Sequence, residues 1–212
     1  MRLVDLSAGY AGKPVLSHFD LELPEKGVVC LLSPSGSGKT TLLRILCGLK
    51  TDYTGRIEGL SGRPVAVFQE DRLLPCLTAL DNVRLPLARE DWPLAQQALS
   101  SLGLAGEEET LPGQLSGGMQ RRVALARAMA FGQACRRRGE EVFFLLDEPF
   151  KGLDPDTKAR TMAALRPVTR DCLTLFVTHD REEALAFGDW LVQLLPDPLR
   201  VQSFSPIPQN NA

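Results

Sequence analysis

The sequence lacks any apolar run of the roughly 18 residues that a membrane-spanning helix needs. Residues 1–5 also lack the layout of a secretory signal peptide. The five cysteines are odd in number and scattered, no Cys-x-x-Cys pair occurs, and there are only two histidines. These shortages argue against a disulfide framework, a zinc site and a histidine-based metal cluster, and they predict a reducing, cytosolic compartment.

Neither sign of charge dominates, because 24 basic side chains face 26 acidic ones and the net charge is -2. We therefore expect no nucleic-acid partner. Three consecutive arginines, 136–138, follow a predicted helix. We interpret them as solvated charges that complement the helix dipole, with a nucleic-acid patch as the alternative. A chain of 212 residues that is 44% hydrophobic can bury a packed core, so we expect one domain, 1–212, with subdomains.

The chain does contain a glycine-rich loop between an apolar run at 28–32 and an amphipathic stretch at 41–49. The loop nearly matches G-x-x-x-x-G-K-[ST], with Ser33 in place of the first glycine. Backbone N–H groups of such a loop hold phosphate oxygens, Lys39 adds a point charge, and the Thr40 hydroxyl can join a Mg²⁺ shell. This predicts a nucleoside triphosphate site rather than an ordinary turn. Its residues are Ser33, Pro34, Ser35, Gly36, Ser37, Gly38, Lys39, Thr40 and Thr41.

Hydrophobic periodicity predicts the fold class. The expected strands are 2–6, 15–23, 28–32, 56–58, 65–68, 142–146 and 173–177, with a closing hairpin over 191–203. The expected helices are 41–49, a segment from 116 to about 130, 156–165 and 181–187. Residues 72–114 carry helical patterns broken by prolines, which we interpret as a small helical insert. The sequence predicts an α/β, P-loop NTPase fold: a mainly parallel sheet with flanking helices, an antiparallel β subdomain and this insert.

Two acids, Asp147 and Glu148, end the apolar strand predicted at 142–146. In P-loop enzymes an acid at the carboxyl end of a strand helps to hold Mg²⁺, which is the role we predict for Asp147. Glu148 is then placed to orient or deprotonate the attacking water as a general base. The alternative is a pair of surface acids.

Three further side chains stand at positions where they could contact the nucleotide. Gln69 follows the strand at 65–68 and could reach the metal or the water. His179 follows the strand at 173–177 and could hydrogen-bond a terminal phosphate. Tyr10, which we place in a loop, could stack on a base. The alternatives are a surface glutamine, a structural histidine and a tyrosine half-buried in a hairpin.

A second anion-binding pattern comes from Ser116, Gly117, Gly118 and Met119, which start a predicted helix. Ser116 is a candidate N-cap, and two glycines let backbone N–H groups approach an anion closely. The chain already has one phosphate loop, so this site is surplus unless it serves another nucleotide.

With these motifs the sequence resembles the ATP-binding cassette (ABC) family, in its transporter ATPase branch. Residues 33–40 resemble its Walker A loop, 115–119 its signature motif, 142–148 its Walker B strand and 152–154 its D-loop. Gln69, His179 and Tyr10 fall where the Q-loop, the switch histidine and the adenine-stacking aromatic of the family lie. The resemblance covers nearly the whole chain, in the family's order.

The resemblance implies that two ATPs, with Mg²⁺, are sandwiched between two such domains in a head-to-tail homodimer. It implies that ATP closes the pair, that hydrolysis opens it, and that integral membrane subunits contacting the helical insert follow the motion. A separate short chain without fused membrane helices favours an importer, which implies a substrate-binding protein and a peripheral position on the cytoplasmic face of the inner membrane. Residues 69–78 resemble importers of nitrate, sulfonate or taurine type, with Cys76 replacing an aromatic residue often seen there.

The chain departs from the family pattern at three places: Ser33 of Walker A, Met119 of the signature motif, and Lys151-Gly152 where small residues are frequent. A Cβ at Ser33 can force the loop off its usual path. None of the three removes a catalytic group, so we expect an active ATPase. The alternatives are a soluble ABC ATPase of DNA repair or translation, which needs a coiled-coil insert or a second cassette, and a P-loop kinase, which leaves the signature helix unexplained.

Overall fold

The computed structural model describes residues 1–34 and 36–208. Its main sheet has six strands in the order β5-β6-β7-β3-β8-β9, of which the first five are parallel and β9 runs antiparallel to β8. These strands are β3 (Gly27–Leu32), β5 (Arg63–Val67), β6 (Val142–Asp147), β7 (Leu173–Thr178), β8 (Trp190–Leu195) and β9 (Arg200–Pro206). The predicted buried strands and the closing hairpin are therefore present. The strands β3, β6 and β7 have nearly continuous apolar sequences because both of their faces are covered.

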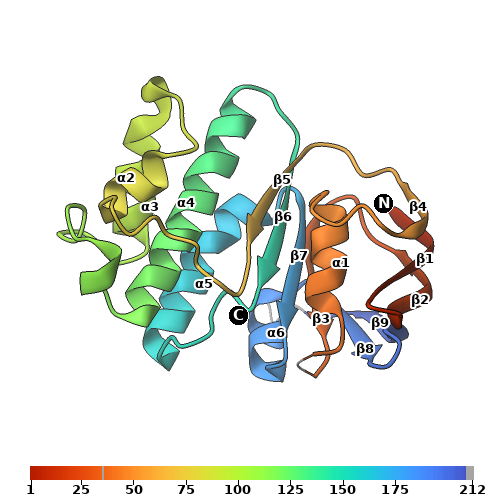
Figure 1. Ribbon diagram of the computed structural model, residues 1–212. Helices are drawn as coiled ribbons and strands as arrows, with labels where there is room; N and C mark the ends of the chain where they lie inside the picture. Colours follow the sequence, from red (N-terminus) through yellow and green to blue (C-terminus); the bar gives the residue numbers. More distant parts are fainter. Residues whose placement is uncertain (35, 209–212) are drawn as a thin grey trace.

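A second sheet is antiparallel, in the order β2-β1-β4, and lies beside the main one (Figure 1). Its strands are β1 (Arg2–Tyr10), β2 (Lys13–Glu22) and β4 (Thr54–Glu58). β1 is longer than predicted, because register shifts between Leu3 and Ala8 interrupt its alternation of apolar and polar side chains. β2 starts and ends slightly earlier than predicted. Tyr10 is the last residue of β1, so its predicted placement in a loop is wrong.

Helices cover both faces of the main sheet (Figure 1). α1 (Lys39–Leu46) lies on the side of the antiparallel sheet, and α4 (Gly117–Arg137), α5 (Pro155–Thr169) and α6 (Arg181–Phe187) lie on the other. Alternate residues of β3 belong to two separate hydrophobic cores. Val29 and Leu31 are part of the core between the sheet and α1, whereas Val28 and Cys30 are part of the core between the sheet and α4. The phosphate loop thus leaves a strand that is fixed from both faces.

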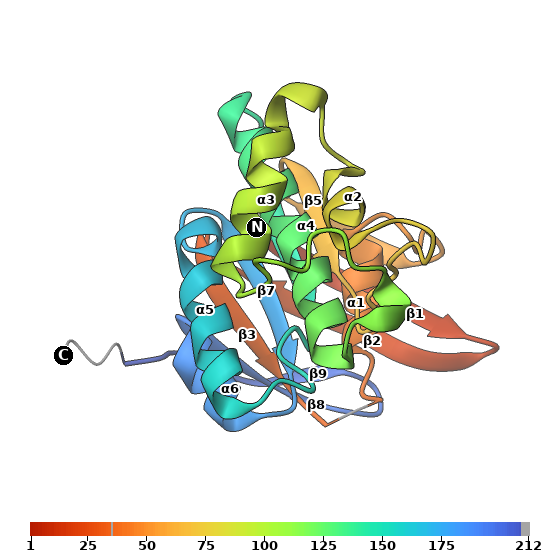
Figure 2. The same cartoon turned by 90° about the vertical axis from the view of Figure 1, so that its left-hand side faces the viewer.

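Four short helices lie within residues 72–114, and the two α-helices among them pack along α4 (Figure 2). They are α2 (Ala79–Arg84), η1 (Arg89–Asp91), α3 (Trp92–Ser101) and η2 (Pro112–Gln114). α4 itself runs further than predicted, so that Arg136 and Arg137 lie in its last turn. Arg136 pairs with Asp171 at 3.5 Å, and Arg138 pairs with Asp91 at 2.6 Å, so these two arginines bind acids of the same chain rather than only solvent.

Helix starts follow ordinary capping chemistry. Ser116 accepts a hydrogen bond from the amide of Met119 at 3.2 Å, which confirms it as the N-cap of α4. Asp154 caps α5 in the same way through Thr157. Within the described ranges, no helix combines the length and the apolar character needed to cross a bilayer.

Candidate functional site

The loop after β3, the first residues of α1 and the ends of β5 and β6 surround a pocket of about 350 Å³ at the carboxyl end of the parallel sheet. Ligands of open parallel sheets bind at this end. The structure brings most of the predicted residues together there. The lining consists of Tyr10, Val15, Gly36, Ser37, Gly38, Lys39, Thr40, Thr41, Gln69, Asp147 and Glu148.

Lys39 lies at the centre of the phosphate loop and is only 6% exposed. Its Nζ donates to the carbonyl oxygens of Ser33 and Pro34, both at 2.7 Å, and to Ser37 Oγ at 3.1 Å. Burial lowers the pKa of Lys39, opposed by the nearby charge of Asp147. The loop therefore curls around one ammonium group, which is the group expected to meet the outer phosphates.

The glycines of the loop are required by its backbone. Gly36 and Gly38 have φ of 78° and 105°, in the region that favours glycine, and a Cβ on Gly38 would lie 2.4 Å from Val15 Cγ1. Ser33 has no positive φ, so its Cβ does not strain the backbone in this way. Its hydroxyl is buried without a hydrogen-bond partner among the described residues. Ser35 lies outside the described residues.

Thr40 and Asp147 bring two oxygen atoms together at the end of β6. Thr40 Oγ1 donates to Asp147 Oδ2 at 2.7 Å, and Asp147 is 3% exposed. Burial raises the pKa of Asp147, the Thr40 hydrogen bond opposes this, and the charge of Glu148 adds to it. Hydroxyl, carboxylate and amide oxygens suit Mg²⁺, which usually takes one or two protein ligands plus phosphate and water. With Gln69 in the same lining, these residues fit that ion. Among the described residues, no cluster of three or more histidines, cysteines or acids offers another metal site.

Two side chains contact the carboxylate of Glu148: the imidazole of His179 and the ammonium group of Lys151. His179 Nδ1 lies 2.9 Å from its Oε1, and Lys151 Nζ lies 3.3 Å from its Oε2. Burial would raise the pKa of Glu148, but the contacts with His179 and Lys151 outweigh it and lower the pKa. The carboxylate is therefore ionised at neutral pH and able to accept a proton. The contribution of Lys151 was missed from sequence, where it stood only as a departure from the family pattern.

The backbone at Glu148 is unusual, with φ of 47°. A non-glycine residue in this region costs roughly 1–3 kcal/mol and persists only when its surroundings hold it. The amide of Glu148 donates to Val177 O at 2.9 Å, which ties the turn to β7. His179 follows β7 directly and lines an adjoining pocket of about 190 Å³ that shares Glu148.

Tyr10 stands at the rim of the pocket and is 46% exposed. Lys50 Nζ lies 4.4 Å from the centroid of its ring and donates to Gly9 O and to Asp52 Oδ1. Burial would raise the pKa of Tyr10, but hydrogen bonds with Thr41 and Arg44 lower it. The ring is thus held from one side by a cation. Lys50 was not predicted from the sequence, because its contact with Tyr10 joins residues 40 positions apart.

The signature residues do not line this pocket. Ser116 and Gly117 are exposed at the N-terminus of α4, and a Cβ on Gly117 would meet nothing within 4 Å. Gly118 and Met119 are half-buried behind them. The same chain therefore carries a phosphate-type pocket and, apart from it, an open helix start.

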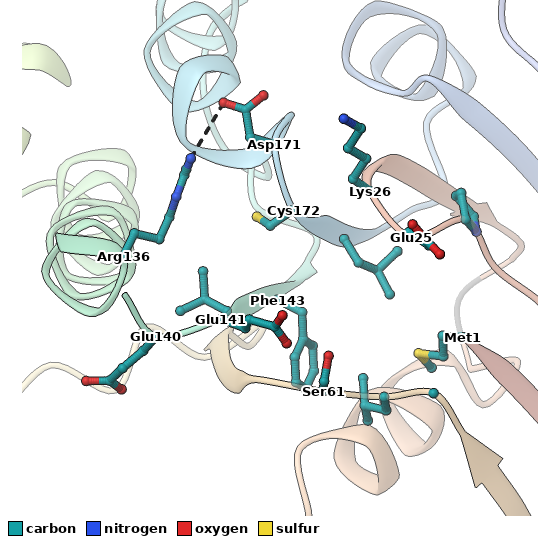
Figure 3. A pocket seen from close by; sticks show the side chains of 15 residues that line it. Met1, Glu25, Lys26, Ser61, Arg136, Glu140, Glu141, Phe143, Asp171 and Cys172 are labelled. Carbon is teal, nitrogen blue, oxygen red and sulfur yellow. Dashed lines mark ion pairs between the residues drawn. The ribbon is translucent and has the colours of Figure 1, made fainter. Parts of the chain in front are cut away.

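A larger pocket of about 470 Å³ lies at the other end of the sheet, where β6 and β7 begin (Figure 3). Its charged side chains are of both signs, and the dashed line in Figure 3 marks the pair Arg136–Asp171. No charged side chain that lines it is buried. The smaller pocket, with its buried lysine and acids, is therefore the candidate site.

Comparison with known proteins agrees with this geometry. The family model described as "ABC transporter" matches residues 16–151. "Aliphatic sulfonates import ATP-binding protein SsuB 2" of Rhodococcus jostii (strain RHA1) is 43% identical over 98% of this chain and 83% of its own length. The protein of that name from Burkholderia lata is 39% identical over 91% of this chain and 71% of its own length.

A solved structure, described as a dimeric post-hydrolysis state of the ATP-binding cassette MJ0796 bound to ADP and Pi, has a TM-score of 0.83 at 28% identity and covers 98% of both chains. This chain belongs to the ABC transporter family, and it is an ATP-binding, ATP-hydrolysing subunit of a transporter. The predicted family and fold class are confirmed. The soluble repair or translation alternative finds no support among these relatives.

Proposed function

We propose that this chain drives the import of an aliphatic sulfonate through separate membrane subunits. The observation that carries the ATPase half of the proposal is the joint placement of Lys39, Thr40, Asp147 and Glu148 around one pocket. The cargo class rests on the relatives, which are named as aliphatic sulfonate import proteins. The chain acts as one nucleotide-binding domain, 1–212, with residues 72–114 as its helical subdomain.

We assign the catalytic roles from the positions and contacts of these residues. Lys39 and the loop Ser33, Pro34, Ser35, Gly36, Ser37 and Gly38 would bind the phosphates, with Thr41 beside them and Tyr10 against the base. Of these residues, Gly36, Ser37, Gly38, Lys39, Thr41 and Tyr10 line the pocket. Thr40, Asp147 and Gln69 would hold Mg²⁺, which would neutralise charge on the phosphates. Glu148 accepts a proton from the attacking water, and His179, 2.9 Å from it, orients this carboxylate and contacts the terminal phosphate.

The open helix start at Ser116, Gly117, Gly118 and Met119 supports a head-to-tail homodimer. Each signature helix would complete the phosphate site of the partner, since it does not reach its own. ATP then bridges two chains, and hydrolysis releases them. The dimer works as a peripheral unit on the cytoplasmic face of the inner membrane, with integral membrane subunits and a substrate-binding protein as partners.

Growth on a sulfonate tests the cargo. We expect a strain deleted for this gene to fail with ethanesulfonate as the sole sulfur source and to grow with sulfate. The wild-type gene should restore growth, and Lys39→Ala should not. Equal growth of the deleted strain on both sulfur sources would exclude the proposed cargo. Purified wild-type protein that releases no phosphate from ATP would exclude the ATPase half separately.

A further inference from the structure

Arg121 of α4 is a buried charge, 4% exposed, whose guanidinium is saturated with acceptors. All five N–H groups of an arginine can donate, and here each has a partner. Nε donates to Pro149 O at 3.2 Å, and the two Nη atoms donate to carbonyl or carboxylate oxygens of Phe68, Asp71, Asp147 and Glu148. Only a planar fork can meet such a set at once.

One side of this fork holds the catalytic turn. Asp147 is the last residue of β6 and still pairs with Val177 of β7, whereas Glu148 and Pro149 lie beyond the strand. Buried carbonyls need a donor, and Arg121 supplies it to all three. The turn includes the positive φ of Glu148, so the guanidinium fixes the backbone on both sides of a strained residue.

The other side of the fork holds the segment that carries Gln69. Arg121 Nη1 donates to Phe68 O and lies 2.9 Å from Asp71 Oδ1. Arg127, about two turns further along α4, donates to Asp71 O at 2.8 Å and to Arg72 O at 3.0 Å. Both arginines hydrogen-bond to this segment. Among the contacts of the two arginines with described residues, only those of Arg121 also reach the end of β6.

We propose that Arg121 is a positioning residue for ATP hydrolysis, which acts by holding the Glu148 turn and the Gln69 segment in fixed relation to the signature helix. This rests on the proposed function, because it takes Glu148 as the proton acceptor. As a consequence, the Arg121 side chain links α4, which would contact the partner's nucleotide, directly to the backbone of the chain's own catalytic carboxylate residue, Glu148. Arg121 itself does not line the phosphate pocket.

A double-mutant cycle with single-turnover hydrolysis tests the proposal. We expect Arg121→Gln to bind Mg²⁺-free ATP with affinity within about twofold of wild type, because the phosphate loop keeps its contacts, and to lose about tenfold or more in hydrolysis rate. Arg127→Gln is the matched control: it loses two contacts to the same segment and none to β6, so its rate should fall less than about threefold. Circular dichroism and thermal melting show that each variant is folded. If Arg121→Gln does not fold, Arg121→Lys, which keeps the charge but not the fork, replaces it in the same cycle.

The decisive arm is the double variant. If Arg121 acts through Glu148, adding Arg121→Gln to Glu148→Gln should lower the residual rate by less than about twofold. An additional loss as large as in the wild-type background would overturn the proposal, and so would equal losses for Arg121→Gln and Arg127→Gln. A wild-type rate in Glu148→Gln alone would instead remove the assigned role of Glu148, and this proposal with it.

Discussion

His179 and Glu148 form one hydrogen-bonded pair, with Nδ1 of the imidazole 2.9 Å from Oε1 of the carboxylate. The two residues directly follow neighbouring parallel strands, β7 and β6, so the pairing of these strands brings them together. A protonated imidazole donates through both ring nitrogens, so Nδ1–H can donate to the carboxylate while Nε2–H donates to a phosphate oxygen. The pair therefore links the proton acceptor to the group that would sense the terminal phosphate.

His179→Ala should retain ATP binding and lose most hydrolysis, by roughly 10²-fold. The pocket residues to which we assign phosphate binding are untouched by the change. Stopped-flow nucleotide binding and phosphate release measure the two quantities separately. His18→Ala, which removes an exposed histidine of the antiparallel sheet, is the control and should leave both unchanged. An unchanged hydrolysis rate in His179→Ala would make His179 a structural residue only.

Lys39→Ala should weaken ATP binding by about tenfold or more, because a charge-assisted hydrogen bond contributes about 1.5–3 kcal/mol. It should also abolish hydrolysis. Lys26→Ala provides the control, since Lys26 is exposed and lines the pocket at the other end of the sheet. Isothermal titration with ATP and a phosphate-release assay give the two results. Near wild-type turnover in Lys39→Ala would contradict the assignment of the phosphate loop.

The site was largely predictable because its residues sit at the ends of apolar strands, which local sequence reveals. Asp147 and His179 follow two runs of this kind, and parallel pairing brings the strand ends together. Arg121 and Lys50 could not be found in this way, because their contacts join distant segments. The extent of β1 was also missed, since Asp5 adopts a φ of 56° within it and breaks the alternation that marks a strand.

Thiol labelling should separate the five free cysteines by burial. Cys76 is exposed and should react with an aromatic disulfide reagent in the native protein. Burial raises the pKa of Cys30 well above its usual range, so this thiol stays protonated and should react only after unfolding. Cys76→Ser should remove the fast phase of labelling. Intact-mass measurement without reductant should find no intramolecular bridge; a stoichiometric bridge would contradict the reducing compartment.

Gly132→Ala should destabilise the protein although alanine favours helices by about 1 kcal/mol. A Cβ there would lie 2.5 Å from Cζ of Phe144, which is fully buried and cannot move away. Overpacking of this kind costs about 1–3 kcal/mol. A cost in the upper part of this range exceeds the gain of about 1 kcal/mol in helix propensity. Gly113→Ala, where a Cβ meets nothing within 4 Å, should change stability by less than about 0.5 kcal/mol. Urea unfolding compares the two, and equal midpoints would contradict the packing argument.

Glu148→Gln should trap an ATP-bound dimer. The amide keeps the shape of the carboxylate but cannot accept a proton, so ATP persists. In the proposed head-to-tail arrangement each ATP would bridge two chains and stabilise the pair by mass action, so the protein without ATP should be mostly monomeric. Size-exclusion chromatography with light scattering, with and without ATP, measures this. Monomer alone for Glu148→Gln at high protein and ATP concentrations would exclude an ATP-bridged dimer of the isolated subunit.

The second variant decides which surfaces meet in that dimer. Ser116 is exposed and lies away from its own chain's phosphate pocket, so replacing it cannot disturb that pocket directly. Ser116→Arg in the Glu148→Gln background should place a bulky side chain between the signature helix and the partner's phosphates, and should return the protein to monomer while one-site ATP binding survives. Arg160→Ala offers a control, because Arg160 is an exposed residue of α5. It should leave the dimer intact. If dimers form equally well with Ser116→Arg, the signature helix is not at the interface, and ATP must join the two chains through another surface.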